Sequence, residues 1–232
     1  MTAPTSHADA QRIVRLIDHT LLKSEATPEQ VIRLCEEARQ YGFASVCVNP
    51  IFVPLVVERL AGSESVACTV CGFPLGATPT SVKVFEAQQA VEAGAAEVDM
   101  VMAVGLLKAG QRDAVGEDIA SLVKLVHAHG AILKVIIETG TLTDGEKRTA
   151  CQLARDAGAD FVKTSTGFGP GGATVEDVRL MRETIGPEMG LKASAGIRTL
   201  AQTVALIEAG ATRIGTSAGV QIAKEALGES TI

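Results

Sequence analysis

The chain repeats one pattern of hydrophobic and polar positions along its length. Each unit is an amphipathic segment with helical spacing, rich in Ala, Glu and Arg, followed by a glycine and a short apolar run. The runs are rich in Val, Ile or Ala, as in strands that are covered on both faces. Each glycine suits the left-handed backbone position that ends a helix. The glycines of the six units are Gly42, Gly94, Gly130, Gly158, Gly190 and Gly210.

Two further apolar runs complete the predicted strands. They are Leu16–Thr20, before the first unit, and Val66–Cys71, between the first two units, and they bring the number of strands to eight. Several of the intervening helices open with a capping residue followed by proline, such as Thr27 or Thr78. The helices are expected at 27–41, 51–61, 78–93, 112–129, 143–157, 174–185, 199–209 and 217–227.

Eight strands that alternate with eight helices in 232 residues match the size of a (β/α)8 barrel. The predicted fold class is therefore α/β, a (β/α)8 TIM barrel. A doubly wound open sheet is the alternative, because the pattern counts strands without showing whether the sheet closes. We expect a single domain over residues 1–232, with the barrel core at about 13–226 and a short polar N-terminal extension at 1–12.

Composition and charge narrow the function classes. The chain is 47% hydrophobic and 21% charged, which is enough to bury one large core. Its net charge is 21 − 27 = −6, and its few aromatics are scattered, so nucleic acid is not an expected partner. The first residues lack the apolar segment of a signal peptide, and no run has the length of a membrane span. The sequence thus predicts a cytoplasmic protein without a membrane partner.

The cysteines and histidines do not form a metal-binding pattern. Five cysteines in a chain with no secretion signal predict reduced thiols, not a disulfide framework. Cys68 and Cys71 form a CxxC, but they lie in a strand pattern with no second ligand pair at zinc spacing, so core thiols are the better interpretation. No two of the four histidines are one helical turn apart. We therefore expect no metal.

A lysine stands in the middle of the apolar run at 160–166, Asp-Phe-Val-Lys-Thr-Ser-Thr. A buried ammonium must be paired or deprotonated, and a partly deprotonated lysine is a nucleophile. The alternative is that Lys163 reaches solvent from the end of the strand. Asp99, Lys134 and Lys192 fall within or near the ends of three other predicted strands. In a barrel such side chains converge on the face where active sites lie, whereas the structural alternative is a set of ordinary buried ion pairs.

Glycine-rich loops follow the last three predicted strands, at 167–174, 194–199 and 215–219. Their exposed N–H groups, together with the N-termini of the next helices, would form an anion cradle, although tight turns that need glycine are an alternative. The first loop also matches the dinucleotide pattern GxGxxG, but Pro170 removes a donor and no acidic residue follows at the required distance. No cofactor is therefore expected. The candidate phosphate contacts are Gly172, Gly196, Gly215 and Ser217.

Five segments together resemble the motif set of the deoxyribose-phosphate aldolase family, which are class I aldolases on a (β/α)8 barrel. The segments are IDHTLL at 17–22, EVDMV at 97–101, LKVIIETG at 133–140, DFVKTSTGF at 160–168 and LKASAGIRT at 191–199. The match runs over about 13–226. The resemblance implies reversible cleavage of 2-deoxy-D-ribose 5-phosphate to acetaldehyde and D-glyceraldehyde 3-phosphate, a step of deoxyribose catabolism.

The resemblance also implies roles for individual residues. Lys163 would be the Schiff-base lysine, Lys192 its neighbouring ammonium and a proton donor or acceptor, and Asp99 the proton-transfer acid. Two positions depart from the family: Ala195 stands where a glycine is common, and Phe168 where some relatives have lysine. Both departures predict fewer phosphate contacts. The surrounding network and substrate contacts would include Asp18, Thr20, Lys134 and Thr164.

These residue types suit imine chemistry. A protonated lysine imine supplies an electron sink without a metal, and burial beside the ammonium of Lys192 favours a neutral, nucleophilic Lys163. Asp99 would move protons through a water molecule, and Cys47 either lines the pocket or is a core thiol. A barrel isomerase with Asp99 as base, or a silent phosphosugar-binding protein, would not need both neighbouring lysines. The expected partner is a phosphorylated sugar, and a homo-oligomer is compatible with the sequence.

Overall fold

The eight strands pair in chain order, and the last pairs with the first. In the computed structural model, which describes residues 7–229, every neighbouring pair is parallel and the sheet is a closed barrel. This closure confirms the (β/α)8 barrel and rules out the open doubly wound sheet. The strands are β1 Ile17–Leu21, β2 Ser45–Val48, β3 Val66–Cys71, β4 Glu97–Val101, β5 Ile132–Ile136, β6 Phe161–Lys163, β7 Gly190–Ser194 and β8 Arg213–Thr216.

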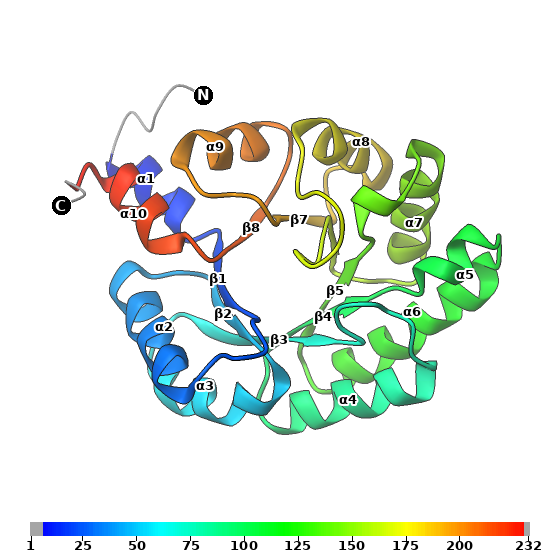
Figure 1. The fold of residues 1–232 in the computed structure, drawn as a ribbon, viewed down its shortest axis with the longest axis horizontal. Coiled ribbons are helices and arrows are strands. Elements are labelled where there is room, and N and C mark those ends of the chain that lie inside the picture. The colour runs from blue at the N-terminus through cyan, green and yellow to red at the C-terminus, as the bar shows by residue number, and fades with distance from the viewer. Residues whose placement is uncertain (1–6, 230–232) are drawn as a thin grey trace.

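Helices surround the barrel, as Figure 1 shows. All of the predicted helices are present, with ends that differ by a few residues from the prediction. They are α2 Pro28–Tyr41, α3 Val53–Leu60, α4 Thr80–Glu92, α6 Arg112–Ala128, α7 Asp144–Asp156, α8 Val175–Ile185, α9 Leu200–Glu208 and α10 Gly219–Leu227. The structure adds elements that the pattern did not predict: α1 His7–Val14, α5 Val104–Lys108 and the short 3-10 helices η1 Pro50–Phe52 and η2 Thr139–Thr141.

The polar N-terminal extension predicted at 1–12 is partly helical. It contains most of α1, which packs against α10 at the other end of the chain (Figure 1). Ala10 and Val14 of α1 are buried in the main apolar core. Residues 1–6 lie outside the described part of the chain.

Most helix ends follow the local sequence signals. The side chain of Thr27 accepts a hydrogen bond from the backbone of Gln30 in a capping box, and Gly42 ends the same helix with φ of 72°. The predicted cap at Thr78 is wrong, because α4 begins two residues later, after Pro79, which has no side-chain cap.

The role predicted for Gly190 is also wrong. It begins β7 and does not end a helix, since α8 stops at Ile185 and the helix is capped by Gly186, which has a positive φ of 77°. A Cβ at position 190 would lie 2.3 Å from Cδ1 of Phe161 on the neighbouring strand. Glycine is therefore needed here for close packing of the aromatic ring and not for a turn.

Alternate residues of each strand face the helices and the barrel interior. In β4, Val98 and Met100 join the main apolar core, while Asp99 forms ion pairs with residues of β5, β6 and β7 inside the barrel. In β3, Cys68 belongs to a small apolar cluster inside the barrel, whereas Cys71 belongs to the main core. The two residues of the CxxC thus face opposite ways. All five cysteines are buried and free, as the sequence predicts.

Candidate active site

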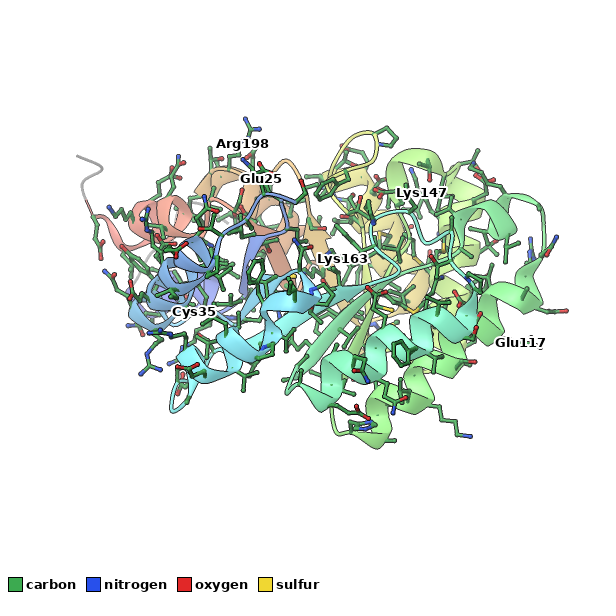
Figure 2. The ribbon with its side chains drawn as sticks, turned by 60° about the horizontal axis from the view of Figure 1, so that its bottom comes forward. Glu25, Cys35, Glu117, Lys147, Lys163 and Arg198 are labelled. Atoms are coloured by element: carbon green, nitrogen blue, oxygen red, sulfur yellow. The ribbon has the colours of Figure 1, made fainter. Side chains whose placement is uncertain are left out.

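The four ionisable residues that the sequence places on four strands meet inside the barrel. Lys163 and Lys192 are register partners on β6 and β7, and Asp99 and Lys134 are register partners on β4 and β5. All four side chains are buried, and Lys163 is only 3% exposed. In Figure 2, Lys163 lies in the middle of the ribbon. The alternative interpretation, in which Lys163 reaches solvent from the end of its strand, is therefore wrong.

Asp99 is the centre of this group. One carboxylate oxygen, Oδ2, accepts hydrogen bonds from Lys163 at 2.8 Å and from Lys192 at 2.7 Å. The other, Oδ1, accepts a hydrogen bond from Lys134 at 2.7 Å. Burial alone would raise the pKa of Asp99, but the three ammonium groups outweigh burial and hold the pKa well below its usual value. Asp99 is therefore a carboxylate at neutral pH, placed to exchange protons with Lys163.

The two flanking lysines keep their charge. Burial would lower the pKa of Lys192, but Asp18 and Asp99 outweigh it and raise this pKa above its usual value. The pKa of Lys134 is raised well above its usual value in the same way, with Asp99 the main opposing charge. Both side chains therefore carry ammonium groups at neutral pH. Lys192 is thus suited to act through its positive charge.

A second group of charges lies beside the first. Asp18, which the resemblance placed in the network, forms an ion pair with Lys192 at 2.5 Å and another with Arg213 at 2.6 Å. Glu97 pairs with Lys134 at 2.6 Å and with Arg213 at 3.0 Å. Burial would raise the pKa of Asp18, but its cationic neighbours, Lys192 foremost, lower it. The carboxylate of Asp18 therefore stays ionised.

Sequence reasoning missed Glu97 and Arg213. A signal was available, because each is a charged residue three positions after the glycine of its unit, Gly94 or Gly210, within a predicted strand. Glu97 also lies two residues before Asp99 and therefore on the same face of that strand. Burial would lower the pKa of Arg213, but Asp18 and Glu97 raise it. The guanidinium also lies over the ring of Phe161, 5.4 Å from its centroid.

Cys47 lies inside the barrel among apolar residues. It is buried in the small cluster with Leu22, Cys68 and Val70. A hydrogen bond from Cys68 lowers the pKa of the Cys47 thiol, while burial raises the pKa of Cys68. The two sulfur atoms and a carboxylate oxygen of Asp99 lie within 4.8 Å of one another. This donor set does not suit a metal ion, because three ammonium groups already contact Asp99.

A cavity of about 410 Å³ opens over Lys163. Its walls are Lys163 and residues of the loops that follow β1, β6, β7 and β8, at the carboxyl ends of the strands. Besides Lys163, two basic residues line it, Lys23 and Arg198, and Arg198 lies at the upper edge of the ribbon in Figure 2. The predicted substrate contacts that line the cavity are Thr20, Gly196, Gly215 and Ser217.

These four residues offer different groups to a ligand. Gly196 and Ser217 form no hydrogen bond within residues 7–229, so their donors are open to an anion. The hydroxyl of Thr20 donates to the carbonyl of Asp18 at 2.8 Å. Gly215 lies within β8 and not in the loop where the sequence placed it, and a Cβ there would come within 2.9 Å of Cε of Lys192. Its glycine makes room for the lysine side chain.

Two other predicted contacts do not face the cavity. The hydroxyl of Thr164 donates to the carbonyl of Ser194 at 3.2 Å and accepts from the N–H of Ser194 at 3.1 Å, so it joins β6 to β7. Gly172 packs against Ala195, since a Cβ at 172 would lie 2.5 Å from the Ala195 carbonyl oxygen. Each residue thus contacts a residue that lines the cavity, Ser194 or Ala195.

Glu138 is a further residue that the sequence did not single out. It is buried, has φ of 56°, and its carboxylate accepts hydrogen bonds from the N–H and the hydroxyl of Thr166. The hydroxyl oxygen of Thr166 in turn accepts from the N–H groups of Phe168 and Gly169. Glu138 thus anchors the loop after β6. The hydrophobic and polar pattern does not predict that a glutamate two residues after the end of a strand takes a left-handed backbone conformation.

The two departures from the family motif both lie at the cavity. Phe168 is 57% exposed and meets Phe73 edge to face, with ring centroids 5.3 Å apart, so it joins the loops after β6 and β3. Ala195 has φ of 72°, a left-handed conformation that costs a residue with a Cβ about 1–2 kcal/mol. The methyl group of Ala195 therefore strains the turn before Gly196.

Replacing Ala195 by glycine should raise the melting temperature by about 1–3 °C, because the strain released exceeds the extra entropy that glycine loses on folding. Thermal unfolding of the two proteins checks this. Ala193→Gly is the matched control, since it removes a buried methyl group from the preceding strand, β7, at a residue that is not left-handed, and it should lower the melting temperature. Equal changes in both variants would contradict the assignment of strain to Ala195.

Comparisons with known proteins agree with this site. The model of the DeoC/LacD family aldolases matches residues 12–225. The deoxyribose-phosphate aldolase of Thermococcus gammatolerans is 61% identical over 216 residues, which cover 92% of this chain and 96% of that protein. That of Thermoanaerobacter pseudethanolicus is 59% identical over 214 residues, with 92% and 96% coverage. The tetrameric structure of deoxyribose phosphate aldolase from Aeropyrum pernix has a TM-score of 0.86 at 38% identity, and the match covers 93% of this chain and 91% of that one.

A closed (β/α)8 barrel with a buried lysine held against a carboxylate, beneath a cavity at the carboxyl ends of the strands, has the architecture of a barrel enzyme. The chain belongs to the DeoC/LacD family of aldolases. None of the helices within residues 7–229 combines the length and the hydropathy that crossing a lipid bilayer requires.

Proposed function

We propose that the protein reversibly cleaves 2-deoxy-D-ribose 5-phosphate to acetaldehyde and D-glyceraldehyde 3-phosphate through an imine on Lys163. The observation that carries this proposal is the buried contact of Lys163 with Asp99, which Lys192 shares on the same carboxylate oxygen. Family membership and the names of the relatives support the same reaction. An isomerase would leave the paired lysines without a use.

The residues account for each step of the cleavage. The neutral amine of Lys163 adds to the aldehyde carbon of the open-chain sugar, and loss of water gives a protonated imine. A base removes the proton of the C3 hydroxyl, and the C2–C3 bond breaks to release D-glyceraldehyde 3-phosphate. The electron pair of that bond forms the C1=C2 double bond of an enamine, while the π electrons of the imine move to nitrogen. Protonation of the enamine carbon and hydrolysis then release acetaldehyde. Asp99 exchanges these protons, directly or through water, and Lys192 supports the carboxylate with its charge.

Reduction with borohydride in the presence of acetaldehyde tests the proposal directly. The reduced adduct adds an ethyl group, and peptide mass mapping should place it on the peptide that contains Lys163. An active preparation whose adduct maps to another lysine, or that forms none, would show that the imine has been assigned wrongly. Lys124→Met removes an exposed lysine of α6 and should leave trapping unchanged.

The phosphate group is proposed to bind where the loops after β7 and β8 face the cavity. Gly196 and Ser217 supply open donors there, at loops that lead into α9 and α10. The sequence led us to expect little help from side-chain charge, but Lys23 and Arg198 also line the cavity. A dianion would therefore meet both backbone donors and two cations.

Ser217→Asp should raise the KM for deoxyribose 5-phosphate about 10- to 100-fold, because it sets a carboxylate against the phosphate dianion. Unphosphorylated deoxyribose should be affected much less, since the Lys163 site is unchanged. Steady-state kinetics with the two substrates measure the difference, and Ser217→Ala controls for loss of the hydroxyl. Equal losses for both substrates would place the phosphate elsewhere.

Two further predictions from the sequence remain predictions. The protein is expected to act in the cytoplasm, and a homo-oligomer is proposed, for which the support is that the Aeropyrum pernix relative is described as a tetramer. Size-exclusion chromatography with light scattering would measure the oligomeric state of this chain.

A further inference from the structure

The buried charges around the reactive lysine form a closed ring in which acids and bases alternate. Each of the three carboxylates contacts at least two of the three cations, and each cation contacts at least two of the carboxylates. Lys134 and Asp18 also approach each other across the ring, at 3.6 Å. The nitrogen-to-oxygen distances around the ring are Arg213–Glu97 3.0 Å, Glu97–Lys134 2.6 Å, Lys134–Asp99 2.7 Å, Asp99–Lys192 2.7 Å, Lys192–Asp18 2.5 Å and Asp18–Arg213 2.6 Å. Three negative and three positive charges cancel, so the ring is neutral.

Lys163 is an additional cation beside this ring and is not one of its six members. Its ammonium contacts Asp99 at 2.8 Å, and Asp99 already has two cations of its own. With Lys163 protonated, the buried cluster of seven groups carries a net charge of 4 − 3 = +1. With Lys163 neutral, the cluster carries none. A net charge is costly in a buried environment, whereas a hydrogen-bonded neutral set is much less so.

We infer that Glu97 and Arg213 are positioning residues for the proposed imine chemistry, because they complete the ring of balanced charges beside Lys163. Neither contacts Lys163, and neither lines the cavity. Glu97 holds Lys134 beside Asp99, and Arg213 holds Asp18 beside Lys192. The proton of Lys163 passes to solvent before the amine attacks the aldehyde. The inference rests on the proposed function, since it concerns the same lysine.

Other groups near Lys163 do not alter this balance. Cys47 and Cys68, on β2 and β3, are buried thiols inside the barrel. Lys23 and Arg198, from the loops after β1 and β7, are exposed cations at the cavity. Solvent screens exposed charges more strongly than buried ones. The ring therefore supplies the charges that act on Lys163 without solvent between them.

The inference predicts opposite effects for two substitutions within one ring. Glu97→Gln removes a negative charge, so the ammonium form of Lys163 becomes less favourable and imine formation should extend to lower pH by about one unit. Arg213→Gln removes a positive charge, so imine formation should require a pH higher by about one unit. The double variant restores neutrality and should return the profile to that of the wild type. A merely structural role would not give opposite signs.

The measurement is the rate of borohydride-trappable adduct formation with acetaldehyde, from about pH 5 to about pH 10. Arg213→Lys keeps the charge and should leave the profile in place. Arg155→Gln removes an exposed arginine of α7 and should also leave it in place. Shifts of Glu97→Gln and Arg213→Gln in the same direction, or no shift in either, would overturn the inference. If the wild type forms no adduct on Lys163, the proposed function itself fails.

Loss of one ring member leaves buried charges unpaired, so the single variants must be shown to be folded by circular dichroism. If they are not, a titration of the wild type decides. With ¹³C-labelled lysine side chains assigned by substitution, Lys163 should lose its proton at lower pH than Lys134 and Lys192. Titration of the three lysines together, or of Lys163 last, would contradict the inference.

Discussion

Replacing Lys163 by methionine should lower kcat by at least roughly 10⁴-fold, because the residue is the proposed nucleophile and no other group can form the imine. The same change should leave the melting temperature unchanged or raise it. Methionine has a similar unbranched shape, and its loss of charge leaves the neutral set of three carboxylates and three cations intact. Kinetics and thermal unfolding on one preparation test both parts.

The contrast between activity and stability is the informative part of this result. A nucleophile that is not needed for packing gives an inactive protein of normal stability. A marked fall in the melting temperature would instead show that Lys163 balances Asp99 in the resting protein and that its ammonium is part of the fold. Lys124→Met, which removes an exposed lysine, should alter neither quantity.

Asp99→Asn should impair both activity and stability. The amide leaves the ammonium groups of Lys134, Lys163 and Lys192 without their shared carboxylate. Breaking a buried ion pair in this way costs about 3–5 kcal/mol, which corresponds to a fall of roughly 6–20 °C in the melting temperature of a chain of this length. Loss of the proton-transfer group should lower kcat by about 10²–10⁴-fold.

The pH dependence of stability checks the same assignment. The folded-state pKa values of Asp18 and Asp99 lie below the usual 3.8, so the unfolded chain binds more protons as the pH falls below about 4. Their contribution is present above that pH and is lost progressively below it. Asp99→Asn should weaken this acid dependence in denaturant unfolding. Asn in place of the exposed Asp156 should leave the dependence unchanged, and an unchanged dependence in Asp99→Asn would contradict the assignment.

The sequence predicted the barrel because each unit carries its own local signals. A capping threonine, an amphipathic helix, a glycine and a short apolar run are properties of neighbouring residues. Closure of the sheet is not, since it depends on β1 meeting β8 across the whole chain. The count of eight strands favoured closure, and the register of Ile17 with Ile214 establishes it.

Charged residues in strands were predictable, but their partners were not. The register located Asp99 and the three lysines, while the contacts of Glu97 with Arg213 join residues 116 positions apart. Lys83 shows the same limit, because it lies in a helix, α4, yet is fully buried against Asp118 of α6. Periodicity indicates which face of an element is polar, and long-range geometry decides whether that face meets water or another charge.

The packing of Phe161 against Gly190 has a consequence for how this barrel can change during evolution. The ring occupies the space that a side chain at position 190 would need, and its face supports the guanidinium of Arg213. A substitution at any one of these positions is therefore conditional on the other two. A smaller residue at 161 would open a void and uncover Arg213, and only then would a methyl group at 190 fit. Substitutions at positions 161, 190 and 213 should therefore occur together and correlate across lineages. A substitution at one of these positions alone should be selected against.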